Sequence, residues 1–340
     1  MSLIPNNTNV IKVAIAGMGQ MGGYHLNALR QLAAGDYEDY YKGNVIKHLS
    51  KISICGLCDI NPQMLVRFDK IKTYDNITRL LDETKPHILI VATPTNTHKH
   101  IAAESLSRGV HTFVEKPIVT SDSDINELFE IAKKNKCNLM AGHVERYNPV
   151  SVKIVSLLKN AKPLAKNYSF VRTQKHDSRI TDDIITDKLI HDLDLSLYFF
   201  GNIKNIEIKD YKLFNNQVYE ILLSIQHQNG IKGTIFVSWL KTADTKERKI
   251  EIFQGGHKWK GDLLSKQLWV DDMEIKCHVE GMIKPANNQI KDELLDFIAL
   301  CIEDEPMRSF QNIAPLLSLK EIKHVTKWIE KIISEINLRN

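Results

Sequence analysis

The sequence contains no apolar run long enough to span a bilayer. Its first residues, M-S-L-I-P-N-N-T-N, also lack the basic-then-apolar pattern of a signal peptide. Cysteine is scarce, because only five cysteines are scattered along 340 residues. An odd, scattered set is typical of a reducing compartment and not of a disulfide framework. We therefore expect a cytoplasmic protein.

A strong excess of one charge is also absent. The chain has 45 basic and 41 acidic residues, a formal net charge of +4 and no long run of one sign. Neither nucleic acid nor a membrane surface is therefore expected as a partner, although a local basic pocket for an anionic substrate stays open. With 43% hydrophobic and 25% charged residues, the composition is that of an ordinary globular protein, long enough for two domains.

Cys55 and Cys58 have the C-x-x-C spacing of metal and redox sites. They lie within I-S-I-C-G-L-C-D, which has the pattern of a β-strand. Side chains three residues apart on a strand point to opposite faces, so the two thiols cannot easily share a metal ion or form a disulfide. We therefore expect structural cysteines here, and no metal site in the chain.

The feature that the sequence does offer is a glycine motif near its start. Val10–Ala16 is a short apolar run rich in β-branched residues, as in a strand buried on both faces. Gly17, Gly19 and Gly22 follow with the spacing G-x-G-x-x-G and lead into an expected helix. Bare glycine lets a pyrophosphate approach the backbone, and the free N–H groups of the helix point at the anion. In this context the motif predicts a dinucleotide site, with a functionless tight turn as the alternative.

Asp59 follows the second expected strand, Ile52–Cys58. A carboxylate at this place would hydrogen-bond the adenosine ribose and repel a 2′-phosphate, which favours NAD over NADP. Asp59 comes 37 residues after Gly22, whereas about 20 is usual. The polar stretch Asp36–Lys51 accounts for the excess as an insertion whose own role is not readable. An ordinary helix-capping aspartate is the alternative.

Alternating strand and helix patterns continue to about residue 147. Further strands are expected near Lys72 and at His87–Ala92, His111–Val114 and Asn138–Ala141, and helices at Ile77–Glu83, His98–Arg108 and Ser123–Lys134. This β-α alternation predicts a Rossmann-type domain over residues 1–147, with a doubly wound, mostly parallel sheet. Two polar segments, Thr93–His98 and Glu115–Pro117, fall at carboxyl ends of strands, where such a sheet binds its ligand.

After residue 147 the pattern changes to alternating strands. They are expected at Ala165–Thr173, Ile203–Leu213, Tyr219–Gln228, Ile231–Trp239 and Lys246–Gln254, with helices at Pro149–Leu158, Asp183–Phe200, Asn288–Glu303 and Ile313–Ile336. Asn229-Gly230 is a hairpin signal between two of the strands. Residues 148–340 are therefore expected to form an α+β domain with one large, mostly antiparallel sheet and helices on one face. The C-terminal helices either belong to it or pack back on the first domain.

The free face of such a sheet is a natural surface for self-association. We therefore expect a homodimer or a homotetramer formed through the C-terminal sheet, and the sequence does not decide between them. Trp239 is expected to pack in the core or in this interface.

Four short motifs follow one another along the chain, at Ala16–His25, Ala92–His98, Glu115–Pro117 and Asp187–Asp194. Together they resemble the GFO/IDH/MocA oxidoreductases, the family of glucose–fructose oxidoreductase and inositol dehydrogenase. In that family the lysine of E-K-P and the Asp and His of D-x-x-x-H surround the nicotinamide and the reacting carbinol. The resemblance implies NAD as cofactor and gives those catalytic roles to Lys116, Asp187 and His191.

The expected cofactor contacts combine the glycine motif, the carboxylate after the second strand and the polar strand ends. They are Gly17, Gly19, Gln20, Met21, Gly22, Asp59, Thr93, Pro94, Asn96, His98, Glu115 and Lys116.

A finer resemblance is to the branch that acts on UDP-N-acetylhexosamines, above all the UDP-N-acetylglucosamine 3-dehydrogenases. It rests on Gly142–Pro149, on the segment from Val171 to Arg179 and on Val237–Leu240. It implies oxidation of the C3 hydroxyl of UDP-N-acetylglucosamine. The 3-keto product would feed an aminotransferase in lipid A or surface-sugar synthesis.

Oxidation of an alcohol needs a base for the hydroxyl proton and a cation near the oxygen. Histidine suits the first task because its usual pKa, roughly 6.5, lies near working pH. A lysine stabilises developing negative charge. Asp187 stands four residues before His191 on an expected helix, hence on the same face, where it would orient the imidazole or hold Lys116. The sequence does not decide whether His191 or Lys116 accepts the proton.

A sugar nucleotide carries a diphosphate, which guanidinium groups bind bidentately. The candidate substrate residues are therefore Arg146, Tyr147, Arg172, Arg179 and His191. Ordinary surface arginines are the alternative. Asp192 and Asp194 are expected only to cap or to pair locally.

Two other functions stay open. One is a sugar or polyol dehydrogenase, or a reductase, of another branch of the same family. The other is a non-catalytic NAD-binding regulator, although such a protein has no reason to keep Lys116, Asp187 and His191 together.

Overall fold

The structure is a computed structural model that describes residue 4 and residues 10–35, 51–159, 165–177, 182–239, 246–277, 288–302 and 319–339. The chain divides into two compact units. The first comprises Met1–Val144 and Gly281–Leu319, and the second Glu145–Glu280 and Lys320–Asn340. The expected organisation had one boundary, after residue 147, and left open whether the C-terminal helices pack back on the first domain. Here a later segment belongs to the first unit. Among the described residues, no helix has the length and apolar character needed to cross a membrane.

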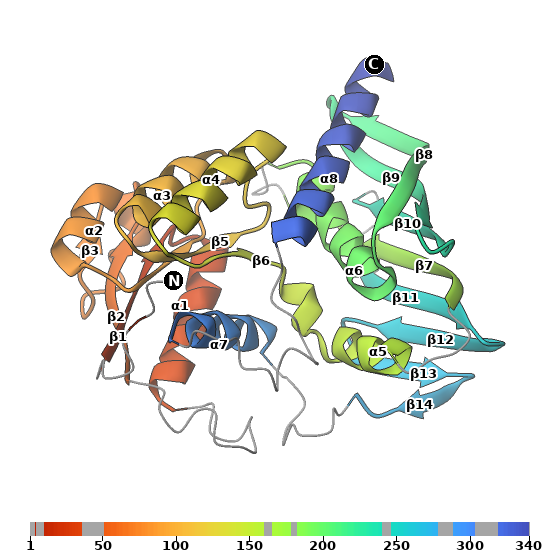
Figure 1. Cartoon of the computed structure of the whole chain (residues 1–340), viewed down its shortest axis with the longest axis horizontal. Helices are drawn as coiled ribbons and strands as arrows, with labels where there is room; N and C mark the ends of the chain where they lie inside the picture. Colours follow the sequence, from red (N-terminus) through yellow and green to blue (C-terminus); the bar gives the residue numbers. More distant parts are fainter. Residues whose placement is uncertain are drawn as a thin grey trace. The chain divides into compact units, whose positions relative to one another are not determined.

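The first unit is built on a parallel sheet of six strands (Figure 1). The strands are β1 (Val10–Ala16), β2 (Lys51–Cys58), β3 (Thr73–Tyr74), β4 (Ile88–Val91), β5 (His111–Glu115) and β6 (Leu139–Gly142). They lie in the order β3-β2-β1-β4-β5-β6, and every neighbouring pair is parallel. The doubly wound Rossmann fold is thereby confirmed. Its switch point, where the winding reverses, lies between β1 and β4.

Helices connect these strands. They are α1 (Gln20–Ala33), α2 (Ile77–Thr84), α3 (Thr95–Ser107) and α4 (Asp122–Lys134), with a 3₁₀ turn at Pro62–Met64 and α7 (Gln289–Ile302) from the returning segment. The expected start of the third helix at His98 is wrong, since α3 begins three residues earlier, directly after Pro94. The fixed φ of proline suits a position at the start of a helix. Helix α7 packs on α1, and Asn288 Nδ2 donates to Gln31 Oε1 at 3.1 Å.

Cys55 and Cys58 lie on β2 and keep free thiols, as expected. Burial, with a smaller contribution from the charge of Asp59, raises the pKa of Cys58 to about 12. A thiol with so high a pKa is not a nucleophile at neutral pH.

The second unit contains an eight-stranded sheet in the order β14-β13-β12-β11-β7-β10-β9-β8. Its strands are β7 (Ala165–Thr173), β8 (Ile203–Phe214), β9 (Gln217–His227), β10 (Lys232–Ser238), β11 (Glu247–Gln254), β12 (His257–Asp262), β13 (Gln267–Val270) and β14 (Met273–Ile275). Only β7 and β10 pair in parallel, so the expected, mostly antiparallel sheet is confirmed. Asn229-Gly230 lies in the β9–β10 turn, where Gly230 has φ +88°.

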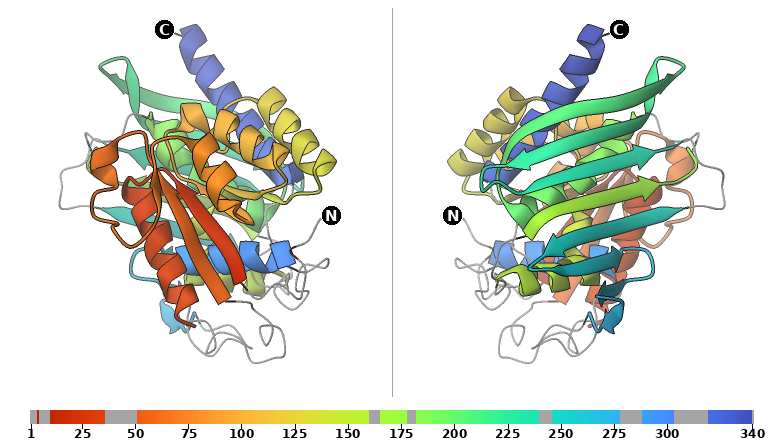
Figure 2. Two further views of the ribbon diagram at one scale, coloured as in Figure 1. Left: turned by 90° about the vertical axis from the view of Figure 1, so that its left-hand side faces the viewer. Right: turned by 90° about the vertical axis from the view of Figure 1, so that its right-hand side faces the viewer.

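Helices cover one face of this sheet, and Figure 2 shows the opposite face free of described helices of this unit. The helical elements are a 3₁₀ turn at Val144–Tyr147, α5 (Pro149–Lys159), a π-helical turn at Ile185–Leu189, α6 (Ile190–Phe200) and α8 (Leu319–Arg339). Residues 313–318 of the expected last helix lie outside the described residues. Self-association through the bare face stays a prediction.

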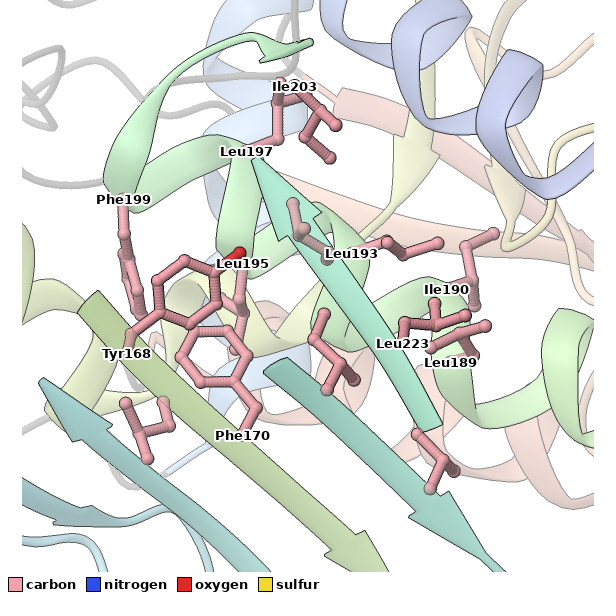
Figure 3. Close-up of a cluster of buried hydrophobic side chains, with 14 of the residues drawn as sticks. Tyr168, Phe170, Leu189, Ile190, Leu193, Leu195, Leu197, Phe199, Ile203 and Leu223 are labelled. Carbon is pink, nitrogen blue, oxygen red and sulfur yellow. The ribbon is translucent and has the colours of Figure 1, made fainter. Parts of the chain in front are cut away.

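The core of the second unit lies between the sheet and α6. Figure 3 shows Tyr168 and Phe170 of β7 beside Leu195 and Phe199 of α6. Burying leucine and phenylalanine side chains stabilises a fold by roughly 1.5–3 kcal/mol each relative to exposure. Helix α6 is buried on nearly every side, and its buried residues include Asp192 and Asp194 as well as leucines and phenylalanines.

Trp239 belongs to the same core and is buried. The expectation that it packs there is confirmed.

Candidate functional site

The expected cofactor residues follow the carboxyl ends of neighbouring parallel strands. Asp59 follows β2, the glycine motif follows β1, the Thr93 turn follows β4 and Lys116 follows β5. Because these strands lie side by side in that order, the residues form one row along one edge of the sheet. The row spans the switch point, which is where an open α/β sheet binds its ligand.

The three glycines of the motif have three different surroundings. Gly17 has φ +89°, and a Cβ built on it would lie 2.5 Å from the carbonyl group of Ala92. A Cβ on Gly22 would lie 1.9 Å from the carbonyl oxygen of Gly17. A Cβ on Gly19, the N-cap of α1, would meet nothing within 4 Å. The outer glycines therefore close the turn against protein, while the middle one faces open space beside a helix N-terminus.

That open space fits a pyrophosphate, since the backbone is bare there and the first N–H groups of α1 need acceptors. Gln20, the first residue of the helix, is exposed, and its side chain donates to the Tyr24 hydroxyl at 2.8 Å. Met21 is half-buried. Neither side chain blocks the N-terminus of the helix from a ligand of this size.

The Asp59 carboxylate holds the glycine turn to the end of β2. Its Oδ2 accepts from Met18 N at 2.7 Å and its Oδ1 from Asn61 N at 2.9 Å. Gly17 N also donates to Cys58 O at 2.8 Å. A carboxylate has about four acceptor sites, so two backbone bonds leave Asp59 capacity for ribose hydroxyls. The residues of the Asp36–Lys51 insertion up to 50 lie outside the described residues.

The turn after β4 is held by its own side chains. Thr97 Oγ1 lies 2.7 Å from both Thr93 Oγ1 and Pro94 O. Pro94 and Asn96 are exposed and Thr93 is half-buried, so all three are accessible as expected.

His98 occupies a different position from the expected one. Its side chain is 1% exposed, with Nδ1 2.9 Å from Pro117 O and Nε2 2.8 Å from Thr93 O. Because both ring nitrogens face backbone carbonyls, His98 joins the Thr93 turn to the E-K-P segment. This joining role replaces the cofactor contact expected from the sequence.

Glu115 likewise points into the protein. Its Oε1 accepts from His25 Nε2 at 2.7 Å, and its Oε2 accepts from Lys116 N at 3.2 Å. Burial alone would raise the pKa of Glu115, but the hydrogen bond and charge of His25, with the charge of Lys116, hold that pKa below its usual range. The carboxylate is thus an anion at neutral pH, and each of its oxygens accepts one of these two hydrogen bonds. Lys116 itself is half-buried and precedes a cis peptide bond to Pro117.

Asp187 and His191 lie in the second unit, and both are half-buried. Asp187 is in the π-helical turn and His191 near the start of α6, so a plain α-helix from 183 to 200 was not the right expectation. Such turns are rare and often occur at functional sites. Asp187 Oδ2 lies 3.1 Å from Lys188 Nζ, a cation that the motif did not single out. Since Lys116 belongs to the first unit, the joint action of all three residues stays a prediction.

Comparison with known proteins relates part of the chain to a family. Residues 11–143 match the GFO_IDH_MocA family, described as an oxidoreductase family with an NAD-binding Rossmann fold. This part of the chain belongs to the GFO/IDH/MocA oxidoreductase family. The resemblance read from the motifs is confirmed, and the description of the family agrees with NAD as the cofactor.

Among individual GFO/IDH/MocA proteins, UDP-N-acetylglucosamine 3-dehydrogenase of Acidithiobacillus ferrooxidans is 24% identical over 196 residues, 56% of this chain and 55% of that protein. The chain thus aligns with about half the length of this curated relative. A solved structure of the same dehydrogenase has a TM-score of 0.75 at 18% identity, covering 95% of this chain and 96% of that one. The WlbA dehydrogenase of Bordetella pertussis, in complex with NADH and UDP-GlcNAcA, has a TM-score of 0.74 at 14% identity, with 94% of each chain covered. These structural likenesses establish the fold.

Two arginines that were expected at the diphosphate bind carboxylates instead. Arg146 donates through Nε and Nη2 to Asp194 at 2.7–3.1 Å and through Nη1 to Glu321 at 2.9 Å. The Arg146 and Asp194 side chains are each 1% exposed. Burial alone would lower the pKa of Arg146, but the two carboxylates outweigh burial and raise it. Arg146 therefore anchors α6 and α8, and the expected contact of Arg146 with the substrate diphosphate is corrected.

Arg172 is buried in the same manner on β7. It donates through Nε and Nη2 to Asp192 at 2.8 and 2.9 Å and through Nη1 to Glu145 at 3.2 Å. Glu145 also accepts from Arg248 at 2.6 Å. Asp192 and Asp194 were expected to cap or pair locally, but they pair with arginines 20 and 48 residues away in the sequence, so this expectation is corrected. The expectation of a phosphate contact from Arg172 is corrected for the same reason as for Arg146.

Two of the remaining substrate candidates, Tyr147 and Arg179, have different outcomes. Tyr147 is buried at the end of its 3₁₀ turn. Arg179 lies outside the described residues, and its expected role stays a prediction.

The glycine geometry predicts three separate outcomes for three alanine variants. Gly22→Ala drives a Cβ into the Gly17 carbonyl, so we expect both unfolding free energy and NADH affinity to fall. Gly19→Ala adds a methyl group only to the open space, so folding is kept while NADH binds about tenfold or more weakly. Gly23→Ala, adjacent in α1 and equally open, leaves binding unchanged and gains up to about 1 kcal/mol of helix stability.

Titration of NADH fluorescence and urea unfolding test this series. Gly23→Ala is the matched control for Gly22→Ala. Wild-type NADH affinity in the Gly19→Ala variant would contradict a pyrophosphate lying over this residue.

Proposed function

We propose that the protein is an NAD-dependent dehydrogenase that oxidises the C3 hydroxyl of UDP-N-acetylglucosamine to a 3-keto sugar nucleotide. The observation that carries the NAD part is the bare backbone at Gly19, beside Asp59 and on the same sheet edge as Lys116. The substrate rests on the motif resemblance and on the likeness to a UDP-N-acetylglucosamine 3-dehydrogenase. The 3-keto product would feed an aminotransferase in lipid A or surface-sugar synthesis.

Each half of the site has its own residues for the cofactor. Asp59 would hold the adenosine ribose, and the backbone around Gly19 the pyrophosphate. Lys116 follows β5, in the half of the sheet beyond the switch point, which in a dinucleotide fold receives the nicotinamide. When bound, NAD⁺ supplies the acceptor for a hydride.

The protein supplies proton transfer and charge stabilisation. The His191 imidazole takes the hydroxyl proton, because its usual pKa of roughly 6.5 suits a base at neutral pH. The Lys116 ammonium stabilises the negative charge that develops on the sugar oxygen as the proton leaves. Asp187 favours the protonated imidazole electrostatically and orients its ring.

The proposal also covers the contact with the substrate diphosphate and the oligomeric state. Arg179 remains the candidate for the substrate diphosphate, because Arg146 and Arg172 are paired with carboxylates. We also propose a cytoplasmic homodimer or homotetramer that associates through the bare face of the eight-stranded sheet.

NADH formation tests the proposed function directly. We expect turnover with UDP-N-acetylglucosamine and NAD⁺, and at least about tenfold lower kcat/KM with NADP⁺ because Asp59 repels its 2′-phosphate. Free N-acetylglucosamine and myo-inositol serve as controls for the nucleotide. Turnover of myo-inositol alone would move the protein to another branch of the family. Tight NADH binding with no turnover of any sugar in the panel would favour the non-catalytic regulator.

A further inference from the structure

The E-K-P segment is joined to the protein by two buried histidines, one on each side of Lys116. His25 of α1 contacts Glu115, the residue before the lysine, and His98 of α3 contacts Pro117, the residue after it. The two imidazoles are 0% and 1% exposed. We call His25 and His98 the histidine clamp.

His25 connects the lysine to the cofactor loop. It lies on α1, the helix whose N-terminus faces the open space at Gly19. Its Nε2 lies 2.7 Å from Glu115 Oε1, and the other carboxylate oxygen accepts the backbone N–H of Lys116 at 3.2 Å. An ionised carboxylate only accepts hydrogen bonds, so His25 donates. One carboxylate thus fixes the lysine backbone to the cofactor helix.

The surroundings leave this carboxylate little freedom. Gly142 of β6 is paired with Glu115, and a Cβ on it would lie 3.3 Å from Glu115 Oε2 and 3.0 Å from the ring of Phe113. Phe113 also packs edge-on against His25, with ring centroids 5.3 Å apart. A side chain at position 142 would crowd the Glu115 carboxylate and the Phe113 ring. Glycine at this position therefore keeps the space that the Glu115–His25 pair occupies.

His98 fixes the other side of the segment. Its Nδ1 lies 2.9 Å from Pro117 O and its Nε2 2.8 Å from Thr93 O, in the turn after β4. Lys116 therefore lies between two fixed points. One is the His25 contact with Glu115, and the other is the His98 contact with Pro117. Both contacts act on the segment around Lys116 and not on the lysine side chain.

We propose that the histidine clamp positions Lys116 for hydride transfer, with His25 and Glu115 acting through the lysine backbone and not by contact with the cofactor or the substrate. The proposal rests on the proposed function for its kinetic consequence. Misplacing a catalytic group by about 1 Å costs roughly 10²-fold in rate. Loss of the His25 contact should therefore lower kcat far more than it changes NADH affinity.

His25→Leu and His25→Gln form the matched pair that tests the clamp. The glutamine amide reaches the position of Nε2 and can donate to Glu115, whereas leucine cannot. We expect His25→Leu to lower kcat by at least about tenfold, with the Kd for NADH changed less than about threefold. His25→Gln should restore kcat to within about threefold of the wild type. Equal kcat in the leucine variant and the wild type would overturn the proposal.

Hydrogen exchange at the Lys116 amide gives a readout that needs no turnover. We expect exchange to be faster in His25→Leu and unchanged in His25→Gln, because only the first frees the Glu115 carboxylate. If the leucine variant does not fold, His25→Asn replaces it, since its shorter side chain cannot reach Glu115. Wild-type exchange in a folded non-donating variant contradicts the clamp. Absence of turnover in the wild type contradicts the proposed function and leaves this measurement valid.

Discussion

Replacing Arg146 by methionine is expected to lower the free energy of unfolding of the second unit by about 3–5 kcal/mol. Arg146 and Asp194 are both 1% exposed and share three hydrogen bonds. Methionine fills a similar volume but removes the guanidinium and its three hydrogen bonds from the buried Asp194 carboxylate. An unpaired buried charge costs far more than an exposed pair contributes, so the loss comes mainly from the carboxylate that remains.

Urea unfolding of matched variants checks this expectation. Arg79→Met is the control, since Arg79 is 63% exposed and its two ion pairs, at 3.6 Å, should contribute at most about 1 kcal/mol. The double variant Arg146→Met with Asp194→Leu removes both charges and should recover most of the loss. Equal destabilisation by Arg146→Met and Arg79→Met would contradict the structural role. A raised KM with unchanged stability would return Arg146 to the substrate site.

The fold could be predicted where local sequence carries the signal. β1 is a continuous apolar run because it is buried on both faces, and the β9–β10 turn contains Asn229-Gly230. β12 was missed because its sequence, H-K-W-K-G-D, places only Trp259 and Gly261 on the buried face. With so little apolar content, the alternation of a strand cannot be distinguished from a polar loop.

The candidate site, too, could be predicted only where short motifs carry the signal. Gly19, Asp59 and Lys116 are set by short motifs at strand ends, so their places on one sheet edge follow from the topology. Partners far apart in the sequence left no such signal. Arg146 and Asp194 are 48 residues apart and His25 and Glu115 are 90 apart, and single-sequence patterns do not pair residues over such distances. The sequence therefore identified charged groups correctly but not the charges that neutralise them.

The π-helical turn at Ile185–Leu189 could not be predicted for a related reason. Its sequence, I-T-D-K-L, is compatible with an ordinary α-helix, and the wider turn depends on packing in the second unit. Only the structure shows that Asp187 lies within this turn and that its carboxylate contacts the ammonium group of Lys188.

Removal of the Lys116 ammonium is expected to have the largest effect on catalysis. Lys116→Met should lower kcat/KM by about 10²–10⁴-fold, the range typical of a lost proton-transfer or charge-stabilising group. NADH binding should be retained, because Asp59 and the glycine turn hold the other half of the cofactor. Steady-state rates with UDP-N-acetylglucosamine, together with NADH titration, measure the two effects separately.

Two further variants decide which residue takes the proton. Lys116→Arg keeps the positive charge but cannot accept a proton, since a guanidinium stays protonated. If Lys116 stabilises charge, the arginine variant retains clearly more activity than the methionine variant, and His191→Asn abolishes the acid limb of the pH–rate profile. If Lys116 is the base, arginine and methionine are equally inactive. Lys99→Met, at a half-exposed pair with Asp124 and Glu127, is the control that should keep wild-type rates. Wild-type turnover in Lys116→Met would show that the chemistry does not depend on the E-K-P lysine.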